Sequence, residues 1–215
     1  MAAGRNGAPS GQSVAPSWYN GPQGGRSPFR DGDHAPQFEA AEVCLGPLKD
    51  DSNVVLIGMP GVGKSTVGVL LAKALSRHFI DTDVLIQAAE GRRLQDIIDS
   101  DGLDAFCRIE ERYVLGLRHK GHVIATGGSV VYSPEAMRHL AAHSVIVYLD
   151  LPLAKLQKRL RNLDSRGVVM APGQSIAELY EQRRPLYEKY AQATIQCEGL
   201  AHEDVVARIM EVLGR

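Results

Sequence analysis

Eight consecutive residues of the chain combine the residue types that bind phosphate groups. Residues 58–65 read Gly-Met-Pro-Gly-Val-Gly-Lys-Ser and directly follow the apolar run at residues 54–57. Glycines at this spacing let backbone N–H groups turn inward onto a phosphate, and a helix that begins there adds partial positive charge. This order of strand, glycine-rich turn, lysine and serine is the P-loop signature, which predicts nucleotide binding.

The side chains at the end of the P-loop indicate how the charge of the nucleotide is balanced. Lys64 supplies a positive charge to the β- and γ-phosphates, and the hydroxyl group of Ser65 is a suitable ligand for Mg²⁺. We therefore expect Mg²⁺ as the cofactor. The nucleotide-binding residues predicted in this segment are Gly61, Val62, Gly63, Lys64, Ser65 and Thr66.

Two carboxylates follow the next short apolar pair, Phe79-Ile80, in the sequence Asp81-Thr82-Asp83. If the apolar pair ends a parallel strand, both carboxylates lie at the carboxyl edge of the sheet, where ligands of open α/β folds bind. A helix cap is the alternative interpretation, but capping accounts for one aspartate better than for two. We expect both side chains to face the P-loop.

A second strand and turn leads from residues 123–125 into Thr126, Gly127, Gly128 and Ser129. Paired glycines after an apolar strand bring bare backbone to the same edge of the sheet. This turn is therefore a candidate for substrate contacts through main-chain N–H groups.

The polar segment at residues 161–167 shows no periodicity, as is typical of a lid, and Arg166 is the candidate for closing over the phosphates. A capping box at residues 175–178 then predicts a helix that includes Arg183 and Arg184 before Pro185 disturbs it. A solvated helix face is the alternative interpretation of these two arginines.

Two other candidate metal sites are weaker. His139 and His143 are four residues apart, but a solvated helix end accounts for them without a metal ion. Asp150 ends the apolar run 145–149 and resembles an Mg²⁺-holding aspartate of ATPases, but Leu151 and Pro152 directly after it weaken that interpretation.

Apolar strands alternate with helix-patterned segments after residue 50. This alternation predicts an α/β fold with a parallel sheet and helices on both faces. The expected strands are residues 54–57, 79–80, 123–125, 145–149 and 193–197. The expected buried stripe of the helix after the P-loop is Val67, Leu70, Leu71, Ala74 and Leu75.

Composition divides the chain into two parts and excludes several classes of protein. Residues 1–50 are rich in Gly, Pro and Ser and predict a disordered tail, and residues 51–215 form the domain. The net charge of −1 does not favour a nucleic-acid partner, and no apolar run approaches the roughly 18 residues that span a membrane. Three scattered cysteines predict neither a disulfide framework nor a zinc site, so we expect a cytoplasmic protein with reduced thiols.

Together these motifs resemble the shikimate kinase family over residues 53–213, about three quarters of the chain. The resemblance implies a P-loop kinase with a five-stranded parallel sheet in the order 2-3-1-4-5, acting as a monomer on ATP and a small molecule. The motifs that occur in the order of the family are the P-loop, Asp81-Thr82-Asp83, Phe106 with Glu110, Thr126-Gly127-Gly128, Arg166, and Arg183 with Tyr187.

The resemblance also implies roles for individual residues. Lys64, Asp83 and Arg166 are the catalytic residues, with Asp83 holding the substrate hydroxyls and acting as base. Arg183 binds the carboxylate of the substrate, and the backbone of Gly127 and Gly128 contacts the substrate. The remaining implied contacts are Arg159 and Arg166 to ATP and Asp81 to Mg²⁺ through water.

Three positions depart from the pattern of the family. Cys107 stands where the family has a carboxylate-binding arginine, Ser129 replaces the third glycine, and Gly167 replaces a proline. Loss of a charge-assisted contact to a carboxylate weakens binding by about 1.5–3 kcal/mol.

We expect transfer of the γ-phosphoryl group of ATP to a hydroxyl of a small carboxylate-bearing metabolite, with shikimate as the leading acceptor. The alternatives are a related kinase with another small acceptor, suggested by Cys107 and Ser129, and a non-catalytic nucleotide-binding regulator.

Overall fold

The computed structural model describes residue 45, residues 47–160, residue 170 and residues 173–215. The expected tail lies outside the described residues up to residue 44, and so do Arg166 and Gly167 of the expected lid. Leu48, at the end of that tail, is buried in the core, and its backbone N–H group donates to the carbonyl oxygen of Leu213 at 3.1 Å.

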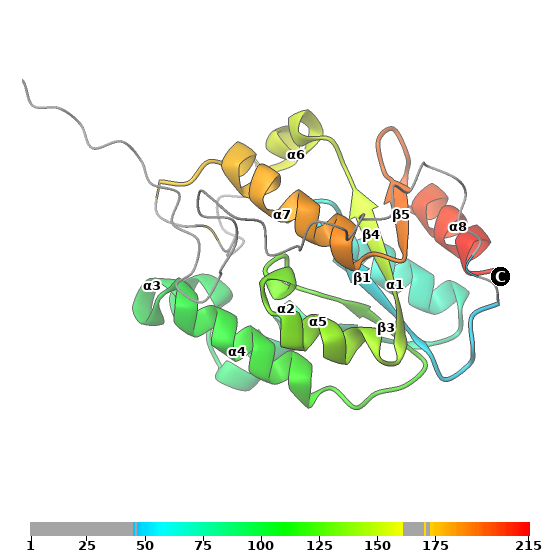
Figure 1. The fold of residues 1–215 in the computed structure, drawn as a ribbon, viewed down its shortest axis with the longest axis horizontal. Helices are drawn as coiled ribbons and strands as arrows, with labels where there is room; N and C mark the ends of the chain where they lie inside the picture. The colour runs from blue at the N-terminus through cyan, green and yellow to red at the C-terminus, as the bar shows by residue number, and fades with distance from the viewer. Residues whose placement is uncertain (1–44, 46, 161–169, 171–172) are drawn as a thin grey trace, which may run out of the picture.

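A five-stranded parallel sheet with the order β2-β3-β1-β4-β5 forms the centre of the fold (Figure 1). This confirms the expected fold class and strand order. β1 is fully buried and is the middle strand, between β3 and β4. The P-loop that follows β1 therefore lies at the middle of the carboxyl edge of the sheet. The strands are β1 Asn53–Ile57, β2 His78–Asp81, β3 His122–Ala125, β4 Ser144–Asp150 and β5 Ala193–Gln196.

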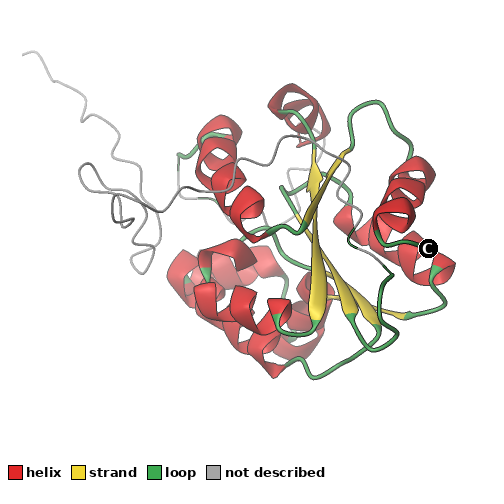
Figure 2. Ribbon diagram, turned by 45° about the vertical axis from the view of Figure 1, so that its right-hand side comes forward, coloured by secondary structure: helices red, strands yellow, loops and turns green. Residues whose placement is uncertain are grey.

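Helices cover both faces of the sheet, as Figure 2 shows. α1 and α8 pack together on one face, and α5 and α7 pack against β4 from the other. Three further helices, α2, α3 and α4, enclose a small apolar cluster of their own that includes Phe106 and Cys107. The helices are α1 Lys64–Ala74, α2 Thr82–Glu90, α3 Leu94–Asp101, α4 Leu103–Gly116, η1 Val130–Tyr132, α5 Pro134–Ala141, α6 Leu153–Leu160, α7 Ile176–Tyr190 and α8 His202–Val212.

Two helices differ from their sequence predictions. Val67 and Leu71 of the expected stripe of α1 are buried, but Ala74 is exposed. Gly68 is also buried, and the ring of Phe79 packs directly against the helix there. Pro185 does not end α7, which continues to Tyr190. Proline has no N–H group, so Pro185 cannot bond to the carbonyl oxygen of Glu181 one turn earlier. Glu181 is exposed, so solvent can take the place of that hydrogen bond.

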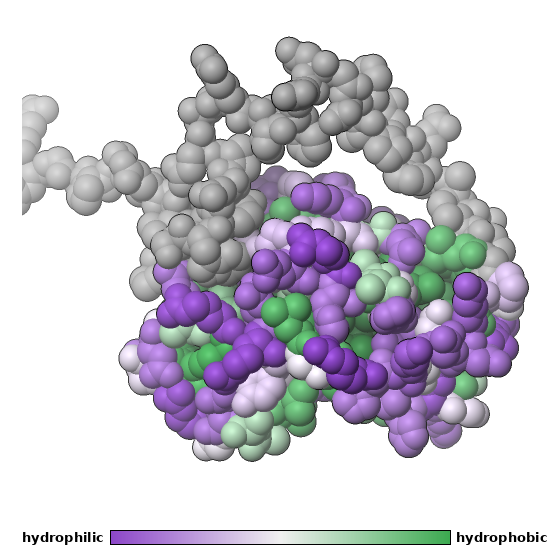
Figure 3. All heavy atoms as spheres, turned by 60° about the horizontal axis from the view of Figure 1, so that its bottom comes forward, coloured by the Kyte–Doolittle hydropathy of each residue, from purple (hydrophilic) through white to green (hydrophobic). Residues whose placement is uncertain are grey.

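The surface of the described part is mainly polar. On the face shown in Figure 3, hydrophilic side chains predominate and the hydrophobic ones form small separate patches. Within the described ranges, no helix is long and apolar enough to cross a membrane.

Candidate active site

The P-loop depends on backbone conformations that favour glycine. Gly58, Gly61 and Gly63 have φ values of 143°, 79° and 110°, and Gly63 is the N-cap of α1. A Cβ atom at Gly58 would also stand 2.6 Å from the carbonyl oxygen of Leu149 in β4. The turn that leads from β1 to α1 is therefore fixed by its glycines.

Lys64 is held inside this turn. Its ammonium group donates to the carbonyl oxygens of Gly58 at 2.8 Å and Met59 at 3.0 Å, and the residue is 9% exposed. Burial lowers the pKa of Lys64 to about 8, and the nearby Asp83 carboxylate opposes that shift. The lysine is thus a cation with little solvation, poised at the carboxyl edge of the sheet.

The two aspartates after β2 have different environments. Oδ1 of Asp81 accepts the backbone N–H groups of Asp83 and Val84 at 3.0 and 3.2 Å, so Asp81 caps α2 as the alternative interpretation predicted. Asp83 is the second residue of α2, in its first turn, where burial and the charge of Asp81 raise its pKa to about 6 while Lys64 and Arg183 oppose the shift. Asp83 and Lys64 are therefore near enough for the charge of each to act on the pKa of the other.

The glycine turn after β3 is tied to its neighbours by hydroxyl groups. Gly127 donates its N–H group to Oγ1 of Thr82 at 3.0 Å, and the hydroxyl group of Tyr187 donates to the carbonyl oxygen of Gly128 at 2.7 Å. A Cβ atom at Gly127 would stand 2.7 Å from Oδ1 of Asp83, and one at Gly128 would stand 3.0 Å from Nη1 of Arg183. The bare backbone lets Asp83 and Arg183 approach the same turn.

Arg183 and Arg184 are adjacent in the sequence but lie in different environments in the structure. Arg183 is 1% exposed, donates from Nε to the hydroxyl group of Tyr132 at 3.1 Å, and places its guanidinium group over the Tyr132 ring. Arg184 is exposed and pairs with Glu188 at 2.8 Å, four residues further along the helix. The solvated-face interpretation is therefore wrong for Arg183 and correct for Arg184.

Glu110 belongs to this site, although the sequence analysis named it only as part of a family motif and gave it no role. It lies on the buried face of α4 three residues after Cys107, and its Oε2 accepts the hydroxyl group of Ser129 at 2.6 Å. Burial and the charge of Asp83 raise the pKa of Glu110 to about 8, although Ser129, Arg183 and Lys64 oppose the shift. Its helical spacing from Cys107 was the signal in the sequence. Burial also raises the pKa of the Cys107 thiol to about 12, so this cysteine is a neutral neighbour.

The far side of the P-loop contains further basic groups. Nη1 of Arg159, at the end of α6, donates to the carbonyl oxygens of Val62 at 3.0 Å and Gly61 at 3.4 Å. The imidazole of His202 lies 3.1 Å from the position of a Cβ atom at Gly63. The predicted contact of Arg166 with ATP lies outside the described residues.

The described residues offer oxygen ligands for a cation near the P-loop but no dense cluster of ligands. No group of three His, Cys, Asp or Glu side chains in the described ranges is arranged to hold a metal ion. Mg²⁺ bound to phosphates keeps several waters and needs only one or two protein ligands. Ser65, exposed in the first turn of α1, and Asp81, whose charge acts on Lys64, fit that requirement.

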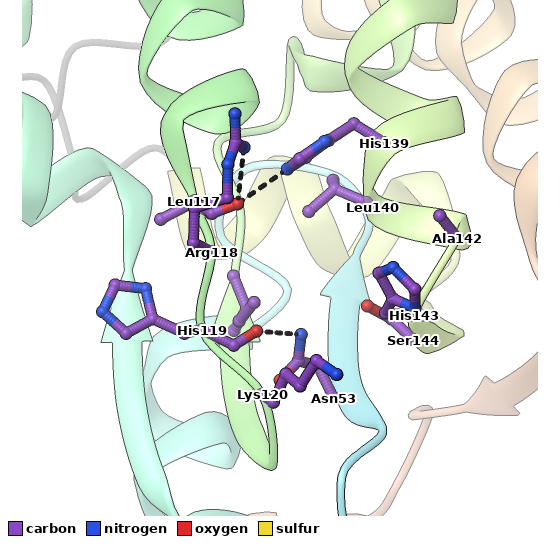
Figure 4. A pocket seen from close by; sticks show the side chains of 11 residues that line it. Asn53, Leu117, Arg118, His119, Lys120, His139, Leu140, Ala142, His143 and Ser144 are labelled. Atoms are coloured by element: carbon purple, nitrogen blue, oxygen red, sulfur yellow. Dashed lines mark hydrogen bonds between the residues drawn. The ribbon is translucent and has the colours of Figure 1, made fainter.

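A cavity of about 340 Å³ lies at the opposite end of the strands (Figure 4). Asn53 and Ser144, the first residues of β1 and β4, contribute to its lining, whereas the P-loop follows the last residue of β1. His139 lines the cavity with its Nε2 atom 2.8 Å from the carbonyl oxygen of Leu117. This cavity is therefore separate from the site at the carboxyl edge.

Comparison with known proteins gives a consistent result. A family model described as shikimate kinase matches residues 60–214. A shikimate kinase from Thermodesulfovibrio yellowstonii is 39% identical over 162 residues, which are 74% of this chain and 93% of the relative. One from Synechococcus elongatus is 35% identical over 167 residues, which are 75% of this chain and 86% of the relative.

Solved structures agree in fold. The shikimate kinase from Acinetobacter baumannii in complex with shikimate matches with a TM-score of 0.71 and 30% identity, covering 75% of this chain and 92% of that chain. The shikimate kinase from Aquifex aeolicus matches with a TM-score of 0.62 and 28% identity, covering 75% and 96% of the two chains.

Proposed function

The chain belongs to the shikimate kinase family, and from this membership and the site geometry we propose that it transfers the γ-phosphoryl group of ATP to a hydroxyl group of shikimate. The enzyme is a phosphotransferase with an alcohol group as acceptor. The observation that supports this function most directly is the arrangement of Lys64, Asp83 and Arg183, which act electrostatically on one another at the carboxyl edge of the sheet.

The nucleotide side of the site accounts for binding of ATP. The backbone of Gly61 to Thr66 surrounds the phosphates, Lys64 neutralises their charge, and Arg159 stabilises the loop through its carbonyl groups. Ser65 would hold Mg²⁺ directly and Asp81 through water, and the ion would neutralise charge on the phosphates when bound. Arg166 completes this set as the residue proposed to close over ATP.

The acceptor side accounts for binding and activation of shikimate. The Arg183 guanidinium group pairs with the acceptor carboxylate, and the backbone of Gly127 and Gly128 lies under the ring. Asp83 accepts the proton of the attacking hydroxyl group as that oxygen bonds to the γ-phosphorus and ADP leaves. Phosphoryl transfer requires mainly alignment and neutralisation of charge, and these residues supply both.

The two alternatives are less favoured. Shikimate kinases match this chain over most of their own length, which argues against another small acceptor. Retention of Lys64, Ser65, Asp81 and Asp83 argues against a non-catalytic regulator. A cytoplasmic location, a monomeric state and the absence of nucleic-acid or membrane partners stay predictions.

An assay of the purified full chain with MgATP tests the function. We expect release of ADP that depends on shikimate, with formation of shikimate 3-phosphate identified by its mass. Gluconate and free amino acids serve as comparison acceptors. Absence of turnover with shikimate would contradict the proposal, and turnover with a comparison acceptor alone would assign the enzyme another substrate.

Gly127→Ala should lower kcat/KM for shikimate by about 100-fold, because its methyl group would overlap Glu110 and press on Asp83. Steady-state kinetics with shikimate as the varied substrate would measure the loss. Gly116→Ala in α4 is the matched control, since nothing lies within 4 Å of its Cβ position. Equal kinetics for the two variants would contradict the close approach of Asp83 to the glycine turn.

A further inference from the structure

The arginine proposed to bind the acceptor carboxylate is held by a tyrosine from another element. Tyr132, the last residue of η1, is 4% exposed, and Arg183 of α7 is 1% exposed. Nε of Arg183 donates to the hydroxyl group of Tyr132 at 3.1 Å, and the guanidinium carbon lies 5.0 Å from the centre of the Tyr132 ring. The guanidinium group therefore contacts both the polar end and the face of one tyrosine.

The direction of the Tyr132 hydroxyl group is fixed by a second residue of α7. The hydroxyl group donates its proton to Oε1 of Gln182 at 2.8 Å, and the same oxygen accepts Nε2 of Gln174 at 3.2 Å. Because a hydroxyl group has one proton and two lone pairs, donation to Gln182 leaves the lone pairs for the N–H group of Arg183. Gln182 therefore orients the hydroxyl group so that it accepts from Arg183.

Tyr132 is also bonded to the glycine turn that the acceptor is proposed to contact. Its backbone N–H group donates to the carbonyl oxygen of Ser129, the residue after Gly128, at 2.9 Å. A Cβ atom at Gly128 would stand 3.0 Å from Nη1 of Arg183, so the Nη1 side of the guanidinium group lies against the turn while Tyr132 holds Nε. One tyrosine side chain thus connects the turn to the arginine beside it.

This support matters because arginine has a long side chain with much rotamer freedom. An arginine that already has its binding orientation loses less freedom when the ligand arrives, and an oriented guanidinium group can pair with both oxygens of a carboxylate. Cys107, whose thiol pKa is influenced by the charge of Arg183, is neutral because burial raises that pKa to about 12. It adds no positive charge that could compensate for a misplaced arginine.

We propose that Tyr132 is a positioning residue whose hydroxyl group orients the guanidinium group of Arg183 toward the carboxylate of the acceptor. This inference rests on the proposed function, in which Arg183 binds that carboxylate. Because Tyr132 acts on the acceptor through Arg183, its contribution should depend on the carboxylate of the acceptor and on the presence of Arg183. It should appear in the affinity for shikimate and not in the affinity for ATP.

Removal of one hydroxyl group tests this role. Tyr132→Phe keeps the ring beside the guanidinium group, and Oε1 of Gln182 keeps Gln174 as its donor. The matched control is Tyr113→Phe, which removes a hydroxyl group that donates at 2.8 Å to Glu90, where α4 meets the end of α2. Steady-state kinetics would give kcat and KM for both substrates, and calorimetry would give their dissociation constants.

Two further measurements separate positioning of Arg183 from packing. Arg183→Lys and the double variant with Tyr132→Phe complete a double-mutant cycle, because lysine has no Nε N–H group for the tyrosine to hold. The methyl ester of shikimate, which lacks the carboxylate charge, would be titrated into the wild type and Tyr132→Phe. The ester needs no substitution at Arg183, so it tests the same point even if Arg183→Lys fails to fold.

We expect Tyr132→Phe to raise KM and the dissociation constant for shikimate by about five- to tenfold at pH 7, with kcat and KM for ATP within about twofold of wild type. Tyr113→Phe should match the wild type in all of these values. In the Arg183→Lys background, Tyr132→Phe should change shikimate affinity by less than about twofold. The ester should bind equally to the wild type and Tyr132→Phe.

The outcomes distinguish this inference from the proposed function. Absence of turnover of shikimate by the wild type would overturn both. Turnover by the wild type together with unchanged shikimate affinity in Tyr132→Phe would overturn the role of Tyr132 alone. The same conclusion would follow if Tyr132→Phe weakened binding equally in the Arg183→Lys background or equally for the ester. A parallel loss of ATP and shikimate affinity would indicate a structural role and would also overturn it.

Discussion

Lys64→Met will lower kcat/KM for ATP by about 10³-fold, because it removes the one buried cation placed inside the P-loop turn. Phosphoryl transfer spreads negative charge over the γ-phosphoryl oxygens, and a preorganised positive charge in a poorly solvated site stabilises that state strongly. Steady-state kinetics with ATP as the varied substrate would measure the effect. The control is Lys73→Met, an exposed lysine in the last turn of the same helix.

Lys64→Met should also increase the stability of the folded protein. Burial lowers the pKa of Lys64 from 10.5 to about 8, so the folded state binds fewer protons than the unfolded state between those values. At pH 7 the charged lysine therefore costs stability, and Lys64→Met should raise the free energy of unfolding by about 1–3 kcal/mol. Urea denaturation at pH 7 would measure it. An inactive variant that is also less stable would indicate that Lys64 has a structural role.

The sequence was sufficient to predict those features that depend on neighbouring residues along the chain. The P-loop could be located because positive φ values and close backbone approach require glycine whatever surrounds them, as Gly58 and Gly63 show. The order of the strands could be predicted only from the resemblance to the kinase family, because alternation of strands and helices predicts a parallel sheet without fixing its order. The site residues after β2 and β3 could be located because parallel strands bring their carboxyl ends to one edge.

What the sequence could not predict depends on contacts between distant segments. Arg183 and Arg184 are adjacent, and only the packing of α7 against η1 buries one of them on Tyr132. The resemblance singled out Glu110 as part of a motif, but its burial with Ser129 near Asp83 became apparent only in the fold. In α1, periodicity correctly predicted Val67 and Leu71 as buried, but Ala74 of the same stripe is exposed. Gly68, which the pattern did not select, is buried against the ring of Phe79.

Asp83→Asn will lower kcat with shikimate by about 10²–10⁴-fold, the range expected when a positioned base is removed. Asparagine has nearly the same shape, so the acceptor should still bind, and KM for shikimate should change far less than kcat. KM for ATP should stay close to wild type, because Lys64 and the backbone of the P-loop hold the nucleotide. Steady-state kinetics with each substrate varied in turn would separate these effects.

Asp96→Asn makes the same change at an exposed position in α3 and controls for the loss of one negative charge. Asp83 also opposes the desolvation of Lys64, so its removal lowers the positive charge available to the phosphates. If that indirect effect dominated, the variant would show a raised KM for ATP, whereas loss of the base lowers kcat alone. A variant with normal kcat would therefore contradict the role of Asp83 as base, and a variant altered only in KM for ATP would assign Asp83 to the electrostatics of the P-loop.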